Sequence, residues 1–473
     1  MSPNLKANLF RLALLPLTAI LLVASGCTAS MNSATQSATG PLFLVGTDAP
    51  MAAVTSFPVT VNSITATNTA NQSVTLLNSA TNVDFARYNG LQALLDINNV
   101  TPGTYTSVTI TLGSGTIYYL NTGSGAPTIA NMPATIVTNP VTVQLSKPLV
   151  VGVSGSAPVG LRIDFNLAKS IETTNGQING KVNPTFDVQA VANTDEGGHI
   201  DEYVAGVVSV NQSAQSFVVQ GPHGGDFTIN VSSSTEWDGD ASLSMLAGCT
   251  GTCIVQVSGK MDRADQTLDA DEVAVLTDTG FYATGQITYV TPATSFQLFV
   301  RGLEPVNTGL TLGQIANVEL TGNETYDIYW MHDELTQFLF NQSSLVAGQD
   351  VAIGGPASGA TNASDVTVKR IHLREWGFNG TITAVPNATN GTFTMTVNGF
   401  AGVLIPQTVT VYLGPECDFR DGLGESGFSS LANGASVRVV GLLLYDSSNG
   451  QTVLLARHVD GLNFTDSATS PWE

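Results

Sequence analysis

Short alternations of apolar and polar residues run along most of this chain of 473 residues. The segments 57–64, 106–112 and 141–145 alternate in this way and are rich in Val, Ile and Thr, which is typical of β-strands that bury one face. Turns rich in Gly, Asn and Ser separate such segments, and no stretch keeps a helical period of apolar residues over a useful length. The pattern predicts an all-β protein.

The C-terminal part of the chain repeats one pattern three times. Gly206, Gly285 and Gly380 each lead a strand that is followed by a turn and by a second strand with a phenylalanine. These phenylalanines are Phe217, Phe296 and Phe393. Each unit then carries a loop that ends in glycine, a further strand and a closing strand. Units of this size can each close a small apolar core, so the repeat predicts three small β-barrels, and residues from about 203 to 473 are expected to fold without the preceding segment.

These patterns divide the chain into consecutive segments. We expect a signal segment at 1–26, a flexible tether at 27–40 that is rich in Ser, Thr, Ala and Asn, and a β-sandwich at 41–195. The three barrels are expected at 203–278, 281–374 and 376–464.

An ordered set of short motifs in the sandwich segment resembles the bacterial family called domain of unknown function 4382. The set comprises residues 47–50 (Thr-Asp-Ala-Pro), 102–105 (Pro-Gly-Thr-Tyr) and 161–165 (Leu-Arg-Ile-Asp-Phe), followed by Lys169 and Ser170. The resemblance implies a β-sandwich of Ig-like or transthyretin-like type in a surface lipoprotein, and it carries over no catalytic residue. The glycine-based repeats are similar to the family called domain of unknown function 5666, whose units look like small OB-like barrels.

Cys27 ends a run of residues that is typical of a bacterial lipoprotein signal. Lys6 and Arg11 precede a short apolar stretch at 12–25, and small residues stand just before the cysteine. A thiol at the cleavage point can carry a diacylglyceryl group, and durable anchoring needs at least two acyl chains, which lipoprotein processing supplies. Thr28 stands where an aspartate would signal retention in the inner membrane. We therefore expect a lipid anchor at Cys27 in the bacterial envelope, on the outer membrane; the alternative is an ordinary secretory signal with a coincidental cysteine.

The charge balance restricts the partners that the protein can bind. The formal net charge is −21, and only 11% of the residues are charged. A negative field without clusters of Lys and Arg argues against nucleic acid, whose phosphates need such clusters. We therefore expect the protein to contact the membrane through the lipid anchor alone and to bind no nucleic acid. A glycan or another envelope protein is the partner that we expect.

Cys249 and Cys253 lie in a loop extension that the other two barrel units lack. Two cysteines in such a loop of a protein in an oxidising compartment predict a disulfide. A Cys-x-x-x-Cys metal site is the alternative, but no histidine or second cysteine pair lies beside it. Cys417 is expected to pack as a small apolar residue.

Acidic residues crowd the join between the expected sandwich and the first barrel. Asp195, Glu196, Asp201 and Glu202 lie there together with His199. Such oxygen ligands could hold Ca²⁺, although their spacing is not that of an EF-hand. A solvated acidic linker is the interpretation that we favour, so we expect no metal site.

An aromatic-rich insertion interrupts the second barrel. Tyr326, Tyr329, Trp330 and His332 cluster there, between regular strands. Exposed rings of this kind form ligand surfaces, for example for sugars. The alternative, which we favour, is that these rings cover the open end of their own barrel.

Motifs of known enzyme classes do not stand out in the chain. The five histidines are scattered, and there is no His-Glu-x-x-His, Gly-x-Ser-x-Gly, P-loop or Rossmann glycine set. We therefore expect a non-enzymatic binding or scaffolding protein of the envelope, without a cofactor. The alternatives are a hydrolase that acts on polysaccharides through paired carboxylates, and a calcium-dependent adhesion module.

Overall fold

The computed structural model describes residues 39–461 with short gaps. The gaps are 50–53, 89–90, 122–127, 155, 157, 176, 193–198, 223–224, 239–240, 263–265, 278–279, 305–307, 329–337, 388–390, 398–406, 421–422 and 447. The expected signal segment, Cys27 and nearly all of the expected tether therefore lie outside the described residues. None of the helices in the described part of the chain is long and apolar enough to cross a membrane.

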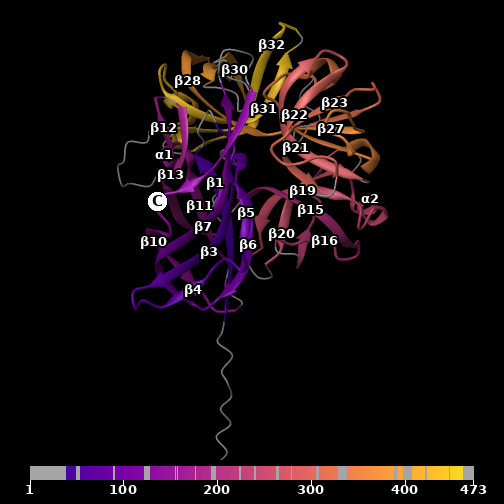
Figure 1. The fold of residues 1–473 in the computed structure, drawn as a ribbon. Coiled ribbons are helices and arrows are strands. Elements are labelled where there is room, and N and C mark those ends of the chain that lie inside the picture. Colours follow the sequence, from indigo (N-terminus) through magenta and orange to yellow (C-terminus); the bar gives the residue numbers. More distant parts are fainter. Residues whose placement is uncertain are drawn as a thin grey trace, which may run out of the picture. The chain divides into compact units, whose positions relative to one another are not determined.

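Two β-sheets face each other in the N-terminal part of the chain (Figure 1). The first has the order β14 (Phe186–Ala192), β11 (Val159–Asn166), β1 (Gly40–Ala49) and β6 (Ala93–Val100). The second has the order β10 (Val141–Val151), β7 (Gly103–Asn121), β3 (Pro58–Asn68) and β4 (Ser73–Thr75). Strands β2 (Val54–Ser56) and β8 (Thr128–Pro133) pair with β7, and β5 (Thr81–Asp84) pairs with β3. Together the two sheets form a β-sandwich.

Short elements complete the sandwich. A small third sheet has the order β12 (Ile171–Thr174), β13 (Gln177–Val182) and β9 (Thr135–Ile136). The 3-10 helix η1 (Phe85–Tyr88) follows β5, and the short helix α1 (Leu167–Ser170) follows β11. The helix η1 carries Arg87 and Tyr88 to the surface that meets the first barrel.

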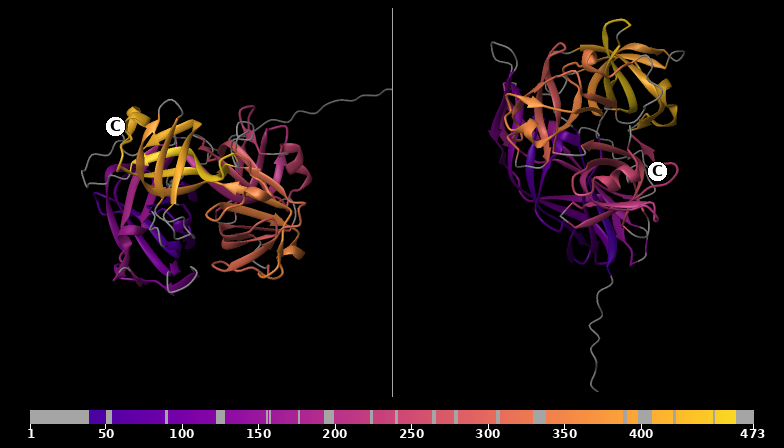
Figure 2. Two further views of the ribbon diagram at one scale, coloured as in Figure 1. Left: turned by 90° about the horizontal axis from the view of Figure 1, so that it is seen from above. Right: turned by 90° about the vertical axis from the view of Figure 1, so that its right-hand side faces the viewer.

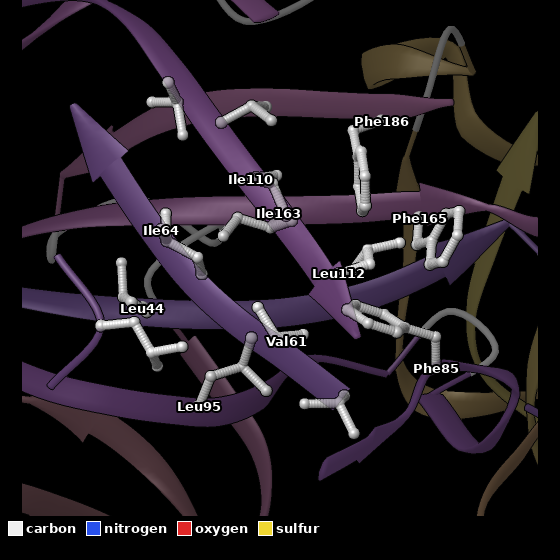
Figure 3. Close-up of a cluster of buried hydrophobic side chains, with 14 of the residues drawn as sticks. Leu44, Val61, Ile64, Phe85, Leu95, Ile110, Leu112, Ile163, Phe165 and Phe186 are labelled. Atoms are coloured by element: carbon white, nitrogen blue, oxygen red, sulfur yellow. The ribbon is translucent and has the colours of Figure 1, made fainter. Parts of the chain in front are cut away.

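The sandwich core lies between the two sheets (Figure 3). Leu44 from β1 and Ile163 from β11 lie in it with Val61 from β3 and Ile110 from β7, and all four are buried. Alternate residues of each strand reach this core because successive side chains of a strand point to opposite faces. Burying one such side chain fully contributes about 1.5–3 kcal/mol. The alternation that predicted these strands is therefore the alternation of core and outer face.

Each of the three repeats has the same strand connectivity. Its first strand is antiparallel to the second and fourth strands, and its second strand is antiparallel to the third. The last strand is antiparallel to the fourth strand. It is parallel to the third strand in the first and third repeats. This order is that of a small OB-like barrel.

The first and second repeats occupy residues 199–277 and 281–374. In chain order, the first holds β15 (His199–Asn211), β16 (Ser216–Gln220), β17 (Asp226–Asn230), β18 (Glu236–Trp237), α2 (Leu243–Gly248), β19 (Ile254–Met261) and β20 (Leu268–Thr277). The second holds β21 (Phe281–Thr291), β22 (Ser295–Glu304), β23 (Ile315–Glu319), β24 (Thr325–Ile328), η3 (Gln342–Ser344), β25 (Asp350–Gly355), η4 (Ala357–Ala360), β26 (Val366–Thr367) and β27 (Arg370–Arg374). A break of two residues divides the last strand of the second repeat into β26, which is parallel to β23, and β27, which is parallel to β24.

The third repeat closes into a barrel with an unbroken ring of five strands. It holds β28 (Trp376–Asn387), β29 (Thr392–Val397), β30 (Gln407–Arg420), η5 (Gly424–Ser430), β31 (Ser436–Asp446) and β32 (Gln451–Gly461). Figure 2 shows these strands, orange to yellow, curled around a common interior. Phe217, Phe296 and Phe393 are buried in three separate apolar cores, one for each repeat. The prediction of an all-β protein with an N-terminal sandwich and three barrel repeats is confirmed.

The interface between the sandwich and the first barrel is extensive. Strand β1 buries Leu42 and Leu44 in the sandwich core, and its other face buries Phe43 and Val45 in the core of the first barrel. A continuous apolar run is typical of a strand that is buried on both faces. Strand β6 also pairs with β15, so one sheet runs from the sandwich into the first barrel.

The second and third barrels also share an apolar core. Strand β31 buries Leu443 inside the third barrel, whereas Leu442 and Leu444 belong to the core of the second. Strand β32 divides in the same way, with Leu454 inside the third barrel and Leu455 in the core of the second. The repeats therefore have separate interiors but extensive shared surfaces, and their independence as folding units stays a prediction.

Candidate functional site

A cleft of about 600 Å³ lies between the sandwich and the first barrel. The sandwich contributes β5, η1 and β6, and the barrel contributes β15, the end of β16 and the loop after α2. This volume is within the range of small-molecule sites. The polar lining includes Thr81, Asn82 and Tyr88 from the sandwich, and Tyr203, Gln220 and Thr252 from the barrel.

Among the described residues, no charged side chain lines this cleft. Burial raises the pKa of Tyr88 to about 12, against the lowering effect of Arg87, so the phenol stays protonated at neutral pH. Burial also raises the pKa of Tyr203. Both hydroxyls are therefore neutral groups, and the described lining offers hydroxyls, amides and apolar side chains to a ligand.

Tyr203 forms a fixed part of the barrel wall. Its ring packs edge-to-face on Phe227, with the ring centroids 5.4 Å apart. Its hydroxyl donates a hydrogen bond of 2.6 Å to the carbonyl oxygen of Gln220. Because both ends of the side chain are held, this wall is shaped before any ligand binds, which lowers the entropic cost of binding.

The predicted disulfide is present, and it shapes the same wall. Cys249 and Cys253 are joined, with their Cα atoms 5.4 Å apart. The loop that they close is tied to β15, because the Gly251 amide donates to the Val207 carbonyl oxygen over 2.8 Å and the Val207 amide donates to the Cys253 carbonyl oxygen over 2.9 Å. The loop extension that is peculiar to the first repeat is therefore a wall of the cleft.

Mass spectrometry of a non-reduced digest should recover a peptide linked through Cys249 and Cys253, because the structure joins these two residues. Cys417 lies in β30 and serves as the control, since its thiol should be alkylated in the same unfolded sample. On the chain-entropy view, a loop this short gives about 2 kcal/mol of stability. Alkylation of both loop cysteines in protein from the envelope would contradict the pairing.

Gly206 differs from the equivalent glycines of the other repeats. A Cβ atom on Gly285 would overlap the Phe299 carbonyl oxygen, and one on Gly380 would overlap the Thr396 carbonyl oxygen. A Cβ on Gly206 would meet only the Cys253 carbonyl oxygen, at 3.9 Å, which is an ordinary contact. The close approach of strands that requires glycine in the second and third barrels is thus absent at Gly206, which lines the cleft instead.

A buried ionic cluster joins three of the units beside the cleft. The Glu202 carboxylate of β15 accepts hydrogen bonds from Arg87 of η1 and from Arg374 of β27. The side chains of Glu202 and Arg374 are 5% and 3% exposed, so this cluster is desolvated. Burial alone would raise the pKa of Glu202, but the charges of Arg374 and Arg87 and their hydrogen bonds lower it below its ordinary value.

The cluster continues over the outer face of the second barrel. Arg374 Nη1 lies 3.9 Å from Asp350 Oδ2, and burial raises the pKa of Asp350 to about 6 although Arg374 and Arg301 act to lower it. The Arg301 guanidinium lies 4.2 Å from the ring centroid of Trp376, the first residue of the third barrel, and donates to Gln286 over 3.1 Å. Side chains from all four units therefore meet here, and the cluster fixes how the walls of the cleft are placed.

Asp201 and Glu202 do not form the solvated linker that the sequence suggested. Both are buried in β15. Asp201 Oδ2 accepts a hydrogen bond of 2.7 Å from the backbone amide of Gln92, and Asp201 Oδ1 lies 3.2 Å from His199 Nδ1. Each carboxylate oxygen of Glu202 accepts a hydrogen bond from an arginine. The physical reason is that β15 continues the sandwich sheet, which places these carboxylates inside the structure, opposite cationic groups and backbone amides.

No described group of three or more His, Cys, Asp or Glu residues has an arrangement that could hold a metal ion. Asp195 and Glu196 lie outside the described residues. His199 instead bridges two carboxylates, because its Nε2 lies 3.1 Å from Asp271 Oδ2. Burial would lower the pKa of His199, but the hydrogen bonds to Asp201 and Asp271 raise it above its ordinary value.

The predicted aromatic surface can be placed only in part. Tyr329, Trp330 and His332 lie outside the described residues. Tyr326 is half-buried, and its ring packs edge-to-face on Phe340, with the centroids 5.7 Å apart, against the core of its own barrel. For Tyr326 this contact agrees with the alternative of a ring that covers its own barrel.

Sequence reasoning assigned no functional role to Tyr88, to Gly206 or to the arginines of the cluster. One signal was available, since β27 begins and ends with an arginine and alternates polar with apolar residues in a chain with only 11% charged residues. An arginine at such a position is expected to have a buried partner, because burial of an unpaired charge is costly. The identity of that partner could not be found in this way.

Comparison with known proteins gives one finding, which concerns the sandwich. No curated protein matches the chain. Residues 39–184 hold every strand of the sandwich except β14, and they match the family described as Domain of unknown function (DUF4382).

Proposed function

We propose that this protein is a lipid-anchored lipoprotein of the bacterial envelope, on the outer membrane, which binds an uncharged ligand in the cleft and catalyses no reaction. The single observation that carries the proposal is the cleft of about 600 Å³ with hydroxyls, amides and apolar side chains along its described lining. The three barrels that support one wall and hold it on the sandwich resemble domain of unknown function 5666, and we propose that they belong to that family.

The chemistry of the cleft favours binding over hydrolysis. Glycoside hydrolysis generally uses two carboxyl groups that flank the scissile bond. The described lining holds neither an aspartate nor a glutamate. The neighbouring carboxylate of Glu202 accepts from Arg87 and Arg374, and its lowered pKa does not suit a general acid.

Substitution of Cys27 by serine tests the anchor. We expect Cys27→Ser to move the protein from the membrane fraction to the soluble fraction, or to leave it unprocessed, because only the thiol can carry the diacylglyceryl group. The measurement is envelope fractionation together with metabolic labelling by an alkyne fatty acid. Cys417→Ser is the matched control and should keep both label and membrane fractionation; labelling of the Cys27→Ser protein would contradict the anchor.

A screen of the mature protein tests the binding function. Neutral and acidic oligosaccharides, short peptides, fatty acids and Ca²⁺ should be tested for binding by calorimetry and for turnover by product analysis. We expect saturable binding of an uncharged compound without turnover. Release of cleaved product would favour the hydrolase, and a large rise in melting temperature with Ca²⁺ alone would favour the adhesion module.

A further inference from the structure

We propose that the ligand of the cleft is a short neutral glycan, an inference that rests on the binding function proposed above. The described lining of the cleft contains no charged side chain. A ligand that carries a carboxylate, phosphate or ammonium group would lose its hydration there without gaining a counter-charge, which is costly. The net charge of −21 adds a repulsion for anionic glycans and nucleotides.

The polar groups of the two walls match the hydroxyls of a sugar. The lining includes Asn82 and Gln220, whose side chains carry amides, and Thr81, Thr252 and Tyr88, whose side chains carry hydroxyls. The Thr81 and Thr252 hydroxyls donate to the backbone carbonyl oxygens of Ser79 and Cys249, so they can accept from a ligand, whereas the amides can both donate and accept. A purely apolar ligand, such as an acyl chain, would desolvate these groups without replacing their hydrogen bonds with water.

The apolar groups of the lining suit the remaining surface of a sugar. The apolar residues of the lining include Val83, Leu94 and Leu95 of the sandwich and Pro222 and Ile254 of the barrel. Pyranose rings present C–H groups on their faces and hydroxyls at their edges, so a lining that mixes apolar patches with neutral polar groups fits both.

Gly206 supplies the space for a ring close to the backbone. The equivalent glycines of the other barrels are required by close strand contacts, whereas the space next to Gly206 is open. The loop residue Gly251 also has no heavy atom within 4 Å of a Cβ position. An extended peptide would need a long free strand edge to add to, and β5, the short strand at this site, has only 4 residues.

The test is calorimetric titration of the mature, detergent-solubilised chain with maltohexaose, cellohexaose and chitohexaose. Hexagalacturonate serves as the acidic glycan and tetraalanine as the neutral peptide. We expect binding of at least one neutral glycan. Gly206→Phe, which places a ring in the cleft, should weaken it by about 100-fold or more. Gly248→Phe is the matched control, because Gly248 lies outside the cleft with open space around it, and it should bind within about twofold of the parent protein.

A second variant distinguishes a loss of the binding site from misfolding of the Gly206→Phe protein. Asn82 is exposed, so Asn82→Ala should fold normally while removing one amide from the sandwich wall, and we expect about tenfold weaker binding. Circular dichroism should show the same fold in all three variants.

The outcomes separate the two proposals. Binding of hexagalacturonate or tetraalanine, but of no neutral glycan, in a manner abolished by Gly206→Phe would overturn the glycan inference and leave the binding function intact. Neutral glycans that bind Gly206→Phe as well as the parent protein would overturn the cleft as their site. No binding of any of these probes would overturn the glycan inference, and failure of the wider screen as well would overturn the proposed function.

Discussion

Replacement of Glu202 by glutamine is expected to destabilise the protein by about 3–5 kcal/mol, because it removes the buried carboxylate that pairs with both Arg87 and Arg374. Arg374 is 3% exposed and lies in the second barrel, whereas Arg87 comes from the sandwich. The loss should therefore reach beyond the first barrel, which carries Glu202. The measurement is hydrogen exchange along the chain combined with urea unfolding, and protection should fall in η1, β15 and β27 together.

Glu236→Gln is the matched control, because Glu236 is exposed in β18 and its substitution should change stability by less than about 0.5 kcal/mol. The acid limb of the stability curve gives a second readout. The lowered pKa of Glu202 means that its contribution is complete above the ordinary value of 4.5 and is lost as the pH falls through the lower folded value. Glu202→Gln should flatten that limb. Loss of protection confined to β15, with an unchanged acid limb, would mean that the cluster does not couple the units.

Gly285→Ala is expected to destabilise the second barrel by about 3 kcal/mol or more, because the new methyl group would overlap the Phe299 carbonyl oxygen of the paired strand. A backbone atom cannot move aside without breaking the hydrogen bonds of β21 and β22. Thermal unfolding and hydrogen exchange of these two strands measure the effect.

Gly206→Ala is the matched control, since it introduces the same methyl group at the equivalent position of the first barrel. The nearest atom would lie at 3.9 Å, so the folded state accepts the methyl group. Alanine also lowers the entropy of the unfolded chain, and we expect stability to be unchanged or about 0.5 kcal/mol higher. Equal destabilisation by both substitutions would mean that Gly206 is retained for packing and would weaken its assignment to the cleft.

Local regularities of the chain were sufficient to predict the fold class and the repeats. Alternation of apolar and polar residues marks a strand whatever its partner, because it reflects the two faces of one strand. The recurrence of Gly206, Gly285 and Gly380 at the start of similar strand patterns identified three units without any knowledge of their contacts. The run Leu42 to Val45 was recognisable as a strand, but which unit covers each of its faces was not.

The disulfide was predictable for a similar reason, since both cysteines lie in one short loop that stands out against the repeat. The burial of Asp201 and Glu202 was not predictable. The sequence suggested a solvated linker at these residues, because no lysine or arginine adjacent in the sequence compensates their charge. Their partners are remote, since Arg87 lies 115 positions before Glu202 and Arg374 lies 172 positions after it.

The sequence by itself therefore determined the β-strands, the three repeated units and the loop with its disulfide, all of which depend on neighbouring residues or on a fixed period, whereas the lipid anchor at Cys27 stays a prediction. Only the tertiary structure decided that the sandwich and the first barrel share a sheet, that Glu202 lies between two arginines, and that Gly206 lines a cleft. Burial and ion pairing arise from residues that are distant in the chain and close in space, and a single sequence holds no record of which distant residues meet.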